Sequence, residues 1–144
     1  MRMPVDAVYR RMLADLHDAG FTDLVPAHFA VLRYPGPDDR RPSDLAIEAG
    51  MTRQAMNYLL GQLEQSGYLV RQEDAVDGRS KRIQLTERGN SVGNTIRATV
   101  TAIEAELEEQ LGRAEFNQLR QLLIQLNDTK FARGSRETRQ AADT

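Results

Sequence analysis

With 144 residues and no cysteine, the chain is sized for a single domain that folds without disulfide bonds, thiolate metal clusters or a cysteine redox switch. Its formal net charge of −2 neither requires nor excludes nucleic acid, because binding depends on where charge is concentrated. No apolar run approaches the ~18–20 residues that span a bilayer, and the first residues lack a signal-peptide hydrophobic region. We therefore expect a soluble, cytoplasmic protein with no membrane partner.

The N-terminal third has the spacing of amphipathic helices. Apolar residues recur three and four positions apart over residues 5–19, and Gly20 follows as a natural helix end. A second, short helix is predicted over residues 26–34, because Pro26 suits a first turn and the sequence PGP at 35–37 would stop it. The segment DDRR then marks a surface loop.

Two helices joined by a tight turn come next. Ser43 is predicted to cap the first, because its hydroxyl can accept a hydrogen bond from an unpaired backbone N–H, and Gly50 ends it. The second is predicted over residues 52–66, followed by Gly67 in a left-handed conformation. This pattern is typical of a helix-turn-helix.

After Gly67 the period of apolar residues changes from about 3.6 to 2. The segments YLVRQE and KRIQLT read as two strands, and the Asp-Gly pair between them is a strong hairpin signal. Thr86 is expected to cap a helix over residues 87–111, about 25 residues and nearly 40 Å long, with one continuous apolar stripe. Gly112 breaks it before a last amphipathic helix at 113–128. Residues 133–144 have almost nothing to bury and are expected to be a disordered tail.

The second helix of the helix-turn-helix has one apolar face and one polar face. Its polar face carries Arg53, Gln54 and Asn57 near the N-terminal end, the part that enters the major groove in helix-turn-helix proteins. Arginine can pair with guanine, and glutamine or asparagine with adenine, through two hydrogen bonds each. An ordinary solvated face is the alternative interpretation.

The hairpin tip concentrates positive charge in the sequence DGRSKR. Arg79, Lys81 and Arg82 lie close together beside a turn, and a narrow minor groove with its phosphates attracts such charge. Asp77 stands two residues from Arg79, where its carboxylate could hold the guanidinium in one orientation. The alternative is a solubilising loop.

The combination resembles the MarR-type winged helix-turn-helix transcriptional regulators. The wing signature of that family is Asp-x-Arg, five residues, then Leu-Thr-x-x-Gly. Here it reads Asp77, Arg79, Leu85, Thr86 and Gly89. The preceding segment, PSDLAIEAGMTRQAMNYLLGQLEQSGYLVR, resembles the family's helix-turn-helix without gaps, so the resemblance is strong over residues 41–89.

The resemblance implies a mainly α fold with a small β-hairpin wing, in which N- and C-terminal dimerisation helices flank the winged helix-turn-helix. The expected organisation is one domain over 1–132, with the winged lobe at about 26–86 and dimerisation helices at about 4–20 and 87–130. The long apolar stripe indicates a homodimer independently, because a second copy would cover it. The alternative is that the terminal helices cover it within one chain.

The function that the resemblance implies is that of a transcriptional regulator, most simply a repressor. It would bind double-stranded DNA as a homodimer at a pseudo-palindromic operator. The family pattern places Arg53, Gln54 and Asn57 in the major groove and Ser43 and Thr52 near phosphates. It places Arg79 in the minor groove, oriented by Asp77, with Lys81 and Arg82 on phosphate.

Regulation by a small molecule is also implied, because many family members are released by a ligand that binds between the dimer helices and the DNA-binding lobe. His17, His28, Arg33 and Tyr34 could offer polar groups to such a cleft. Two histidines are too few for a metal sensor, so we expect no metal and no cofactor.

Two other classes of function compete with a regulator. A winged helix used only for protein contacts would expose aromatic or aliphatic residues on its recognition helix, whereas the polar face of this helix carries Arg53, Gln54, Asn57 and Gly61. An enzyme has little support, because no set of nucleophile, base and orienting group is recognisable.

Overall fold

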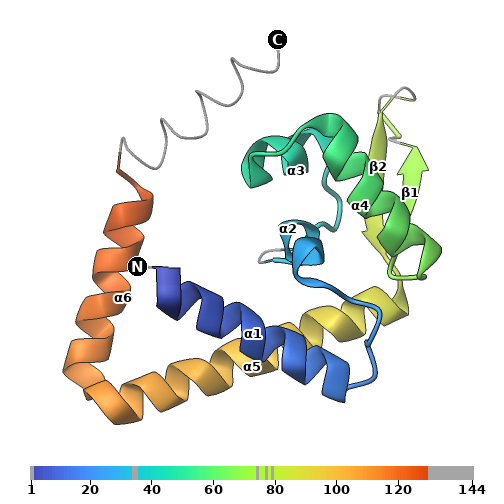
Figure 1. The fold of residues 1–144 in the computed structure, drawn as a ribbon. Helices are drawn as coiled ribbons and strands as arrows, with labels where there is room; N and C mark the ends of the chain where they lie inside the picture. The colour runs from blue at the N-terminus through green and yellow to red at the C-terminus, as the bar shows by residue number, and fades with distance from the viewer. Residues whose placement is uncertain (1, 34–35, 74, 77, 79, 130–144) are drawn as a thin grey trace.

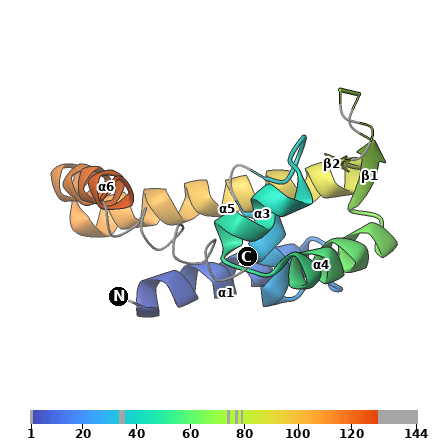
Figure 2. The same ribbon diagram turned by 90° about the horizontal axis from the view of Figure 1, so that it is seen from above.

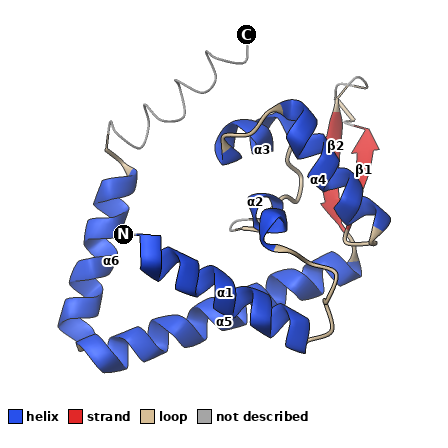
Figure 3. Cartoon of the chain, in the orientation of Figure 1, coloured by secondary structure: helices blue, strands red, loops and turns tan. Residues whose placement is uncertain are grey.

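The computed structural model describes residues 2–33, 36–73, 75–76, 78 and 80–129. The predicted tail at 133–144 and three predicted site residues, Tyr34, Asp77 and Arg79, lie outside this part of the chain. The described part is mainly helical and contains a two-stranded antiparallel sheet (Figure 3). The elements in chain order are α1 Arg2–Asp18, η1 Pro26–His28, α2 Phe29–Leu32, α3 Pro42–Ala49, α4 Arg53–Gln65, β1 Leu69–Glu73, β2 Lys81–Leu85, α5 Glu87–Leu111 and α6 Arg113–Asn127.

Helix α1 lies along α5, and both lie beneath the lobe formed by α2, α3, α4 and the hairpin (Figure 1). Arg11 Nη1 and Nη2 donate to the two carboxylate oxygens of Glu106 over 2.6 and 2.7 Å. The buried hydroxyl of Thr99 donates to Asp15 Oδ2 over 2.6 Å. These contacts join two helices that are far apart in the sequence.

The helix-turn-helix is confirmed, with one correction at its first cap. Helix α3 begins at Pro42, and Arg41 occupies the N-cap position without a side-chain capping hydrogen bond. The prediction that Ser43 is the N-cap is therefore wrong. Proline is suited to the first helical position because its φ is fixed and it has no N–H to satisfy, so the helix starts before Ser43. Gly50 ends α3 with φ 65°, as predicted.

Helix α4 is capped by Thr52, whose Oγ1 accepts a hydrogen bond from Ala55 N over 3.1 Å. Strands β1 and β2 follow in the predicted order, with Leu69 opposite Leu85 and Glu73 opposite Lys81. The backbone before α3 is bonded to β2: Asp39 N donates to Ile83 O over 2.7 Å, and Ile83 N donates to Arg40 O over 2.9 Å. The hairpin is therefore tied to the start of the helix-turn-helix.

The core of the lobe is closed by residues from most elements of the fold. The side chains with at most 1 % exposure include Leu16, Met56, Leu60, Leu63, Tyr68, Leu69, Ile83 and Val92. Thr86 caps α5 as predicted, because its Oγ1 accepts from Gly89 N over 3.1 Å. A Cβ at Gly89 would come within 2.0 Å of Tyr68 O, so the start of α5 can approach the hairpin only with glycine there.

Helix α6 turns away at the end of α5 that is farthest from the hairpin (Figures 1 and 2). Phe116 is buried, but most of the apolar side chains of α6 are exposed: Leu119, Leu122, Leu123, Ile124 and Leu126. The described helices include none that is long and apolar enough to cross a membrane.

Candidate nucleic-acid interface

A shallow basic groove lies between the helix-turn-helix and the hairpin. It has a volume of about 330 Å³ and is lined by Arg41, Pro42, Ser43, Arg53, Asn57, Arg71, Ser80 and Lys81. Four of these described lining residues are arginine or lysine, and none of them is acidic. The residues come from the start of α3, the N-terminal half of α4, β1 and the start of β2. Four basic side chains thus gather in one groove of a chain whose net charge is negative.

The two faces of α4 are separated as the sequence predicts. Arg53, Gln54 and Asn57 are exposed, whereas Met56 and Leu60 are buried against the rest of the lobe. The N-terminus of α4 points its polar residues outward because the apolar face anchors the helix from behind. This places arginine and asparagine side chains in the basic groove.

Arg71 is a groove residue that the sequence analysis missed. Its Nε donates to Glu64 Oε2 over 3.0 Å, and its Nη1 donates to Asn57 Oδ1 over 3.4 Å. The guanidinium lies next to Gly61, where an added Cβ would be 3.7 Å from Nη2. Strand alternation offered a signal, because Arg71 is on the same side of β1 as buried Leu69. Arg41 was missed as well.

The described hairpin residues separate into two groups. Lys81 is exposed and lines the basic groove. Arg82 does not line it: its Nη1 donates to Asp39 O over 2.7 Å and also contacts Asp39 Oδ1 at 3.5 Å. Successive side chains of a strand point to opposite faces, which explains why these neighbours separate. The predicted contact of Arg82 with phosphate remains untested.

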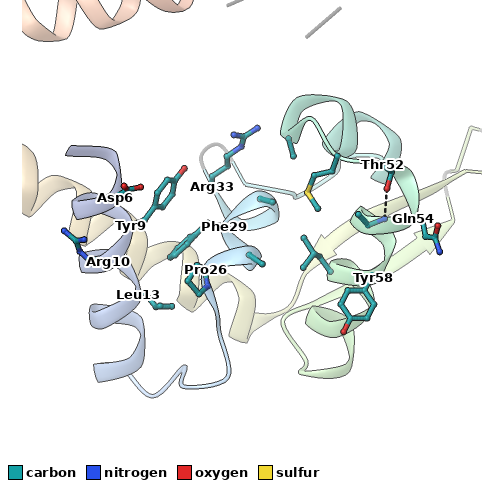
Figure 4. A pocket seen from close by; sticks show the side chains of 16 residues that line it. Asp6, Tyr9, Arg10, Leu13, Pro26, Phe29, Arg33, Thr52, Gln54 and Tyr58 are labelled. Atoms are coloured by element: carbon teal, nitrogen blue, oxygen red, sulfur yellow. Dashed lines mark hydrogen bonds between the residues drawn. The ribbon is translucent and has the colours of Figure 1, made fainter. Parts of the chain in front are cut away.

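An apolar cavity of about 930 Å³ lies between α1, α2 and α4 (Figure 4). Its walls include Tyr9, Leu13, Phe29, Met51 and Leu59, and its polar lining residues include Asp6, Arg10, Arg33, Thr52, Gln54 and Tyr58. Two predicted DNA-contacting residues, Thr52 and Gln54, therefore border this cavity and do not line the basic groove.

Of the four residues predicted for a ligand cleft, Tyr34 lies outside the described residues, and the other three are not gathered in one place. Arg33 lines the apolar cavity and donates from Nη2 to Glu48 O over 2.8 Å. His28 is buried outside the lining, where Nδ1 accepts from Val25 N and Nε2 lies 3.0 Å from Gln62 Oε1. His17 is also outside it, with Nε2 2.8 Å from Leu24 O. Both histidines stabilise the structure around them instead of lining the cavity.

A polar cluster joins the hairpin to α5. The hydroxyl of buried Tyr68 donates to Asp23, and Arg88 Nη2 donates to the Tyr68 hydroxyl over 3.0 Å. The guanidinium of Arg88 also lies over the Tyr68 ring, 4.6 Å from its centroid, and over the ring of Phe21 at 5.9 Å. Cation–π contacts of this kind stabilise the pair further. We call these residues Asp23, Tyr68 and Arg88 the joint cluster.

The joint cluster shifts the acidities of its members. Burial alone would raise the pKa of Asp23, but the hydrogen bond from Tyr68, other hydrogen bonds and the charge of Arg88 together lower it below its ordinary value. Burial, with the hydrogen bond to Asp23, raises the pKa of Tyr68. Both groups are therefore held in the forms that bond to each other at neutral pH.

These elements define a winged helix-turn-helix protein, and comparisons with known proteins show which proteins it is similar to. Residues 22–80 match the model of the MarR family. The solved structure of the MarR family protein Rv2887 of Mycobacterium tuberculosis, in complex with salicylic acid, is 28 % identical, with a TM-score of 0.59 and coverage of 84 % of this chain and 88 % of that one. The match to the family model covers the helix-turn-helix and part of the hairpin, and the fold of the chain is similar to that of MarR family transcription regulators.

Two further structures extend the likeness across the chain. The transcriptional repressor CouR, bound to a 23-mer DNA duplex, is 26 % identical with a TM-score of 0.67, and 87 % of each chain is covered. The regulator Tm0710 of Thermotoga maritima is 25 % identical with a TM-score of 0.59, covering 88 % of this chain and 87 % of that one. The likeness therefore extends well beyond the helix-turn-helix and the hairpin.

Proposed function

We propose that the protein is a non-enzymatic regulator that binds double-stranded DNA as a homodimer and represses transcription from a pseudo-palindromic operator. The observation that carries the proposal is the basic groove, which joins the exposed polar face of α4 to the first residue of β2. Helix-turn-helix proteins insert the N-terminal part of the second helix into the major groove. The repressor CouR, similar in fold, was solved on DNA.

Within this proposal, the residues of the groove divide between bases and phosphates. Arg53 and Asn57, exposed at the start of α4, have the side chains suited to base edges. Lys81 and Arg41, at the rim formed by the hairpin and α3, suit phosphates. Ser43 lines the same groove and could donate its hydroxyl to a phosphate. We extend the proposal to Arg79, oriented by Asp77, in the minor groove.

The homodimer is proposed from the exposed apolar surface of the terminal helices. Leu122 and Leu123 are each more than half exposed on α6, and Leu111 at the end of α5 is 46 % exposed. A second copy would bury this surface and place two recognition helices about one DNA turn, ~34 Å, apart. In this organisation residues 26–86 form the winged lobe, and 4–20 and 87–130 form the dimerisation helices.

Release by a small molecule is proposed from the apolar cavity. Its volume of about 930 Å³ is suited to a drug-sized ligand, and Arg10 and Arg33 at its rim suit an anionic group. Rv2887 was solved with salicylic acid, and CouR of Rhodococcus jostii RHA1 with p-coumaroyl-CoA. Because Thr52 and Gln54 border the cavity, a ligand there would lie against the start of α4.

Selection from a random duplex library, followed by fluorescence anisotropy at several salt concentrations, tests the proposal. We expect a pseudo-palindromic consensus, nanomolar binding and a steep loss of affinity with salt. Arg53→Ala should weaken binding at least tenfold, whereas Arg97→Ala, an exposed substitution on α5 outside the groove, should not. Weak, sequence-blind binding would overturn the proposal and favour a protein-interaction module.

A further inference from the structure

The side chains of Glu64, Arg71 and Asn57 form a chain of contacts between α4 and β1, at one wall of the basic groove. Glu64 Oε2 accepts from Arg71 Nε over 3.0 Å, which fixes the guanidinium over α4. Arg71 Nη1 then donates to Asn57 Oδ1 over 3.4 Å. An arginine has five donors and no acceptor, so the atom of Asn57 that faces it must be the amide oxygen. The orientation of this amide therefore follows from chemistry as well as from geometry.

The fixed orientation determines what Asn57 can offer to DNA. Its oxygen is held toward Arg71, and in the described part of the chain its amide nitrogen has no hydrogen-bond acceptor. Asn57 is exposed and lines the groove, so the free end of the amide is a donor. In the major groove, guanine, adenine and thymine each present an acceptor, whereas cytosine presents only its N4 amino donor.

We propose that Arg71 is a positioning residue for specificity: it holds the amide of Asn57 with its NH2 group toward DNA, so that cytosine is rejected at the base that Asn57 faces. This inference rests on the proposed function, because it requires that α4 enters the major groove. A donor facing the cytosine amino group leaves both groups without a partner in a desolvated interface, which is costly. Without Arg71, the amide could rotate and offer its oxygen to cytosine.

The experiment compares base preferences at every position of the selected operator. For the natural protein we expect cytosine to be penalised roughly tenfold or more at one position in each half-site. Arg71→Met should reduce that penalty to a few fold while the preferences at other positions persist. Asn57→Ala should remove it, and the double variant should behave as Asn57→Ala does, because Arg71 acts through Asn57.

Lys81→Met is the matched control, because it removes a positive charge from the same groove without touching Asn57. It should weaken binding to all sequences about equally. If Arg71→Met also weakens all sequences equally and keeps the cytosine penalty, the inference is overturned and Arg71 is only a phosphate contact. In that case the consensus itself still stands, so the proposed function survives.

A measurement without DNA separates the two claims further. Nuclear magnetic resonance relaxation of the Asn57 side-chain NH2 group should show restricted motion in the natural protein and increased motion in Arg71→Met. Equal mobility in both proteins would overturn the positioning role even if an operator is found. If the amide were restricted but no operator could be selected, the proposed function would be overturned. The proposed rejection of cytosine by Asn57 would then be overturned as well.

Discussion

The winged lobe and α6 differ in the exposure of their apolar side chains, which are mostly buried in the lobe and largely exposed on α6. In the lobe, Leu60 and Leu63 are at most 1 % exposed, and the core is completed by residues of the same chain. On α6, Leu122 and Leu123 are 54 % and 56 % exposed. The core of the lobe is therefore closed within one chain, whereas α6 exposes the apolar surface that the proposed dimer would bury. Substitutions in the lobe should therefore affect folding, whereas substitutions on α6 should affect dimer assembly.

The largest effect is expected from Leu122→Glu combined with Leu123→Glu. Burying a fully exposed leucine stabilises by roughly 1.5–3 kcal/mol. Leu122 and Leu123 are 54 % and 56 % exposed, so the four leucines lost from a dimer correspond to about 3–7 kcal/mol of association free energy. Sedimentation equilibrium at micromolar concentration should show a monomer. Asn117→Glu with Gln121→Glu adds the same charge to another face of α6 and should leave the dimer intact. If the double leucine variant stayed dimeric, the interface would have to lie elsewhere.

Leu60→Ala tests the other half of the comparison, the closed core of the winged lobe. Truncating a fully buried leucine leaves a cavity and costs about 2–5 kcal/mol of the free energy of unfolding. Urea denaturation should show this loss, and the dimer should persist in the absence of denaturant. Tyr58→Ala on the same helix is the control, because Tyr58 is 67 % exposed and its removal should change stability little. A loss below about 1 kcal/mol for Leu60→Ala would contradict a closed core.

Tyr68→Phe tests the joint cluster between the two regions. It removes the hydroxyl that donates to Asp23 and accepts from Arg88, at an expected cost of about 1–2 kcal/mol. Thermal unfolding followed by circular dichroism should show a lower Tm with the fold retained. An unchanged Tm would mean that the cluster does not hold the hairpin to α5.

The pH dependence of the free energy of unfolding provides a second test of the joint cluster. The pKa of Asp23 is lowered on folding, so its contribution is present above the unfolded carboxyl pKa of about 4 and is lost as pH falls through the folded value. The pKa of Tyr68 is raised, so its contribution is intact below pH ~10 and is lost as pH rises through the folded value. Tyr68→Phe should flatten the alkaline loss, and an unchanged alkaline profile would contradict this assignment.

The smallest effect is expected from Arg11→Gln in the contact between α1 and α5. The ion pair with Glu106 is short but both side chains are substantially exposed, and such pairs contribute little and are screened by salt. The variant should lower Tm slightly at low salt, and the difference should vanish at high salt. A large, salt-independent loss would show that this contact does more than fasten two surface helices.

Much of the fold could be predicted because its signals are local. The bounds of α5 follow from Thr86, Gly112 and an unbroken apolar stripe, and the hairpin follows from a change of period. The prediction of an N-cap at Ser43 is wrong because Pro42 is the first residue of the helix, which places the N-cap two residues earlier, at Arg41. Each of these outcomes depends on neighbours in the chain.

The candidate site was less predictable, because it depends on contacts between distant residues. His17 and His28 do not line the apolar cavity, since their ring nitrogens are engaged in hydrogen bonds elsewhere in the fold. Arg71 and Asn57 are 14 positions apart, and only the packing of β1 over α4 at Gly61 brings them together. Sequence periodicity gives the face of a residue but not the partner that it meets there.

Sedimentation equilibrium of the protein on a labelled duplex carrying its selected operator tests the central claim most directly. A lobe whose core is closed within one chain, together with terminal helices whose exposed apolar surface a dimer would bury, predicts two chains of 16.2 kDa on each duplex and half-sites about one helical turn apart. It also predicts that the Leu122→Glu and Leu123→Glu variant, still folded, loses most of its affinity. One chain per duplex with full affinity would contradict the account.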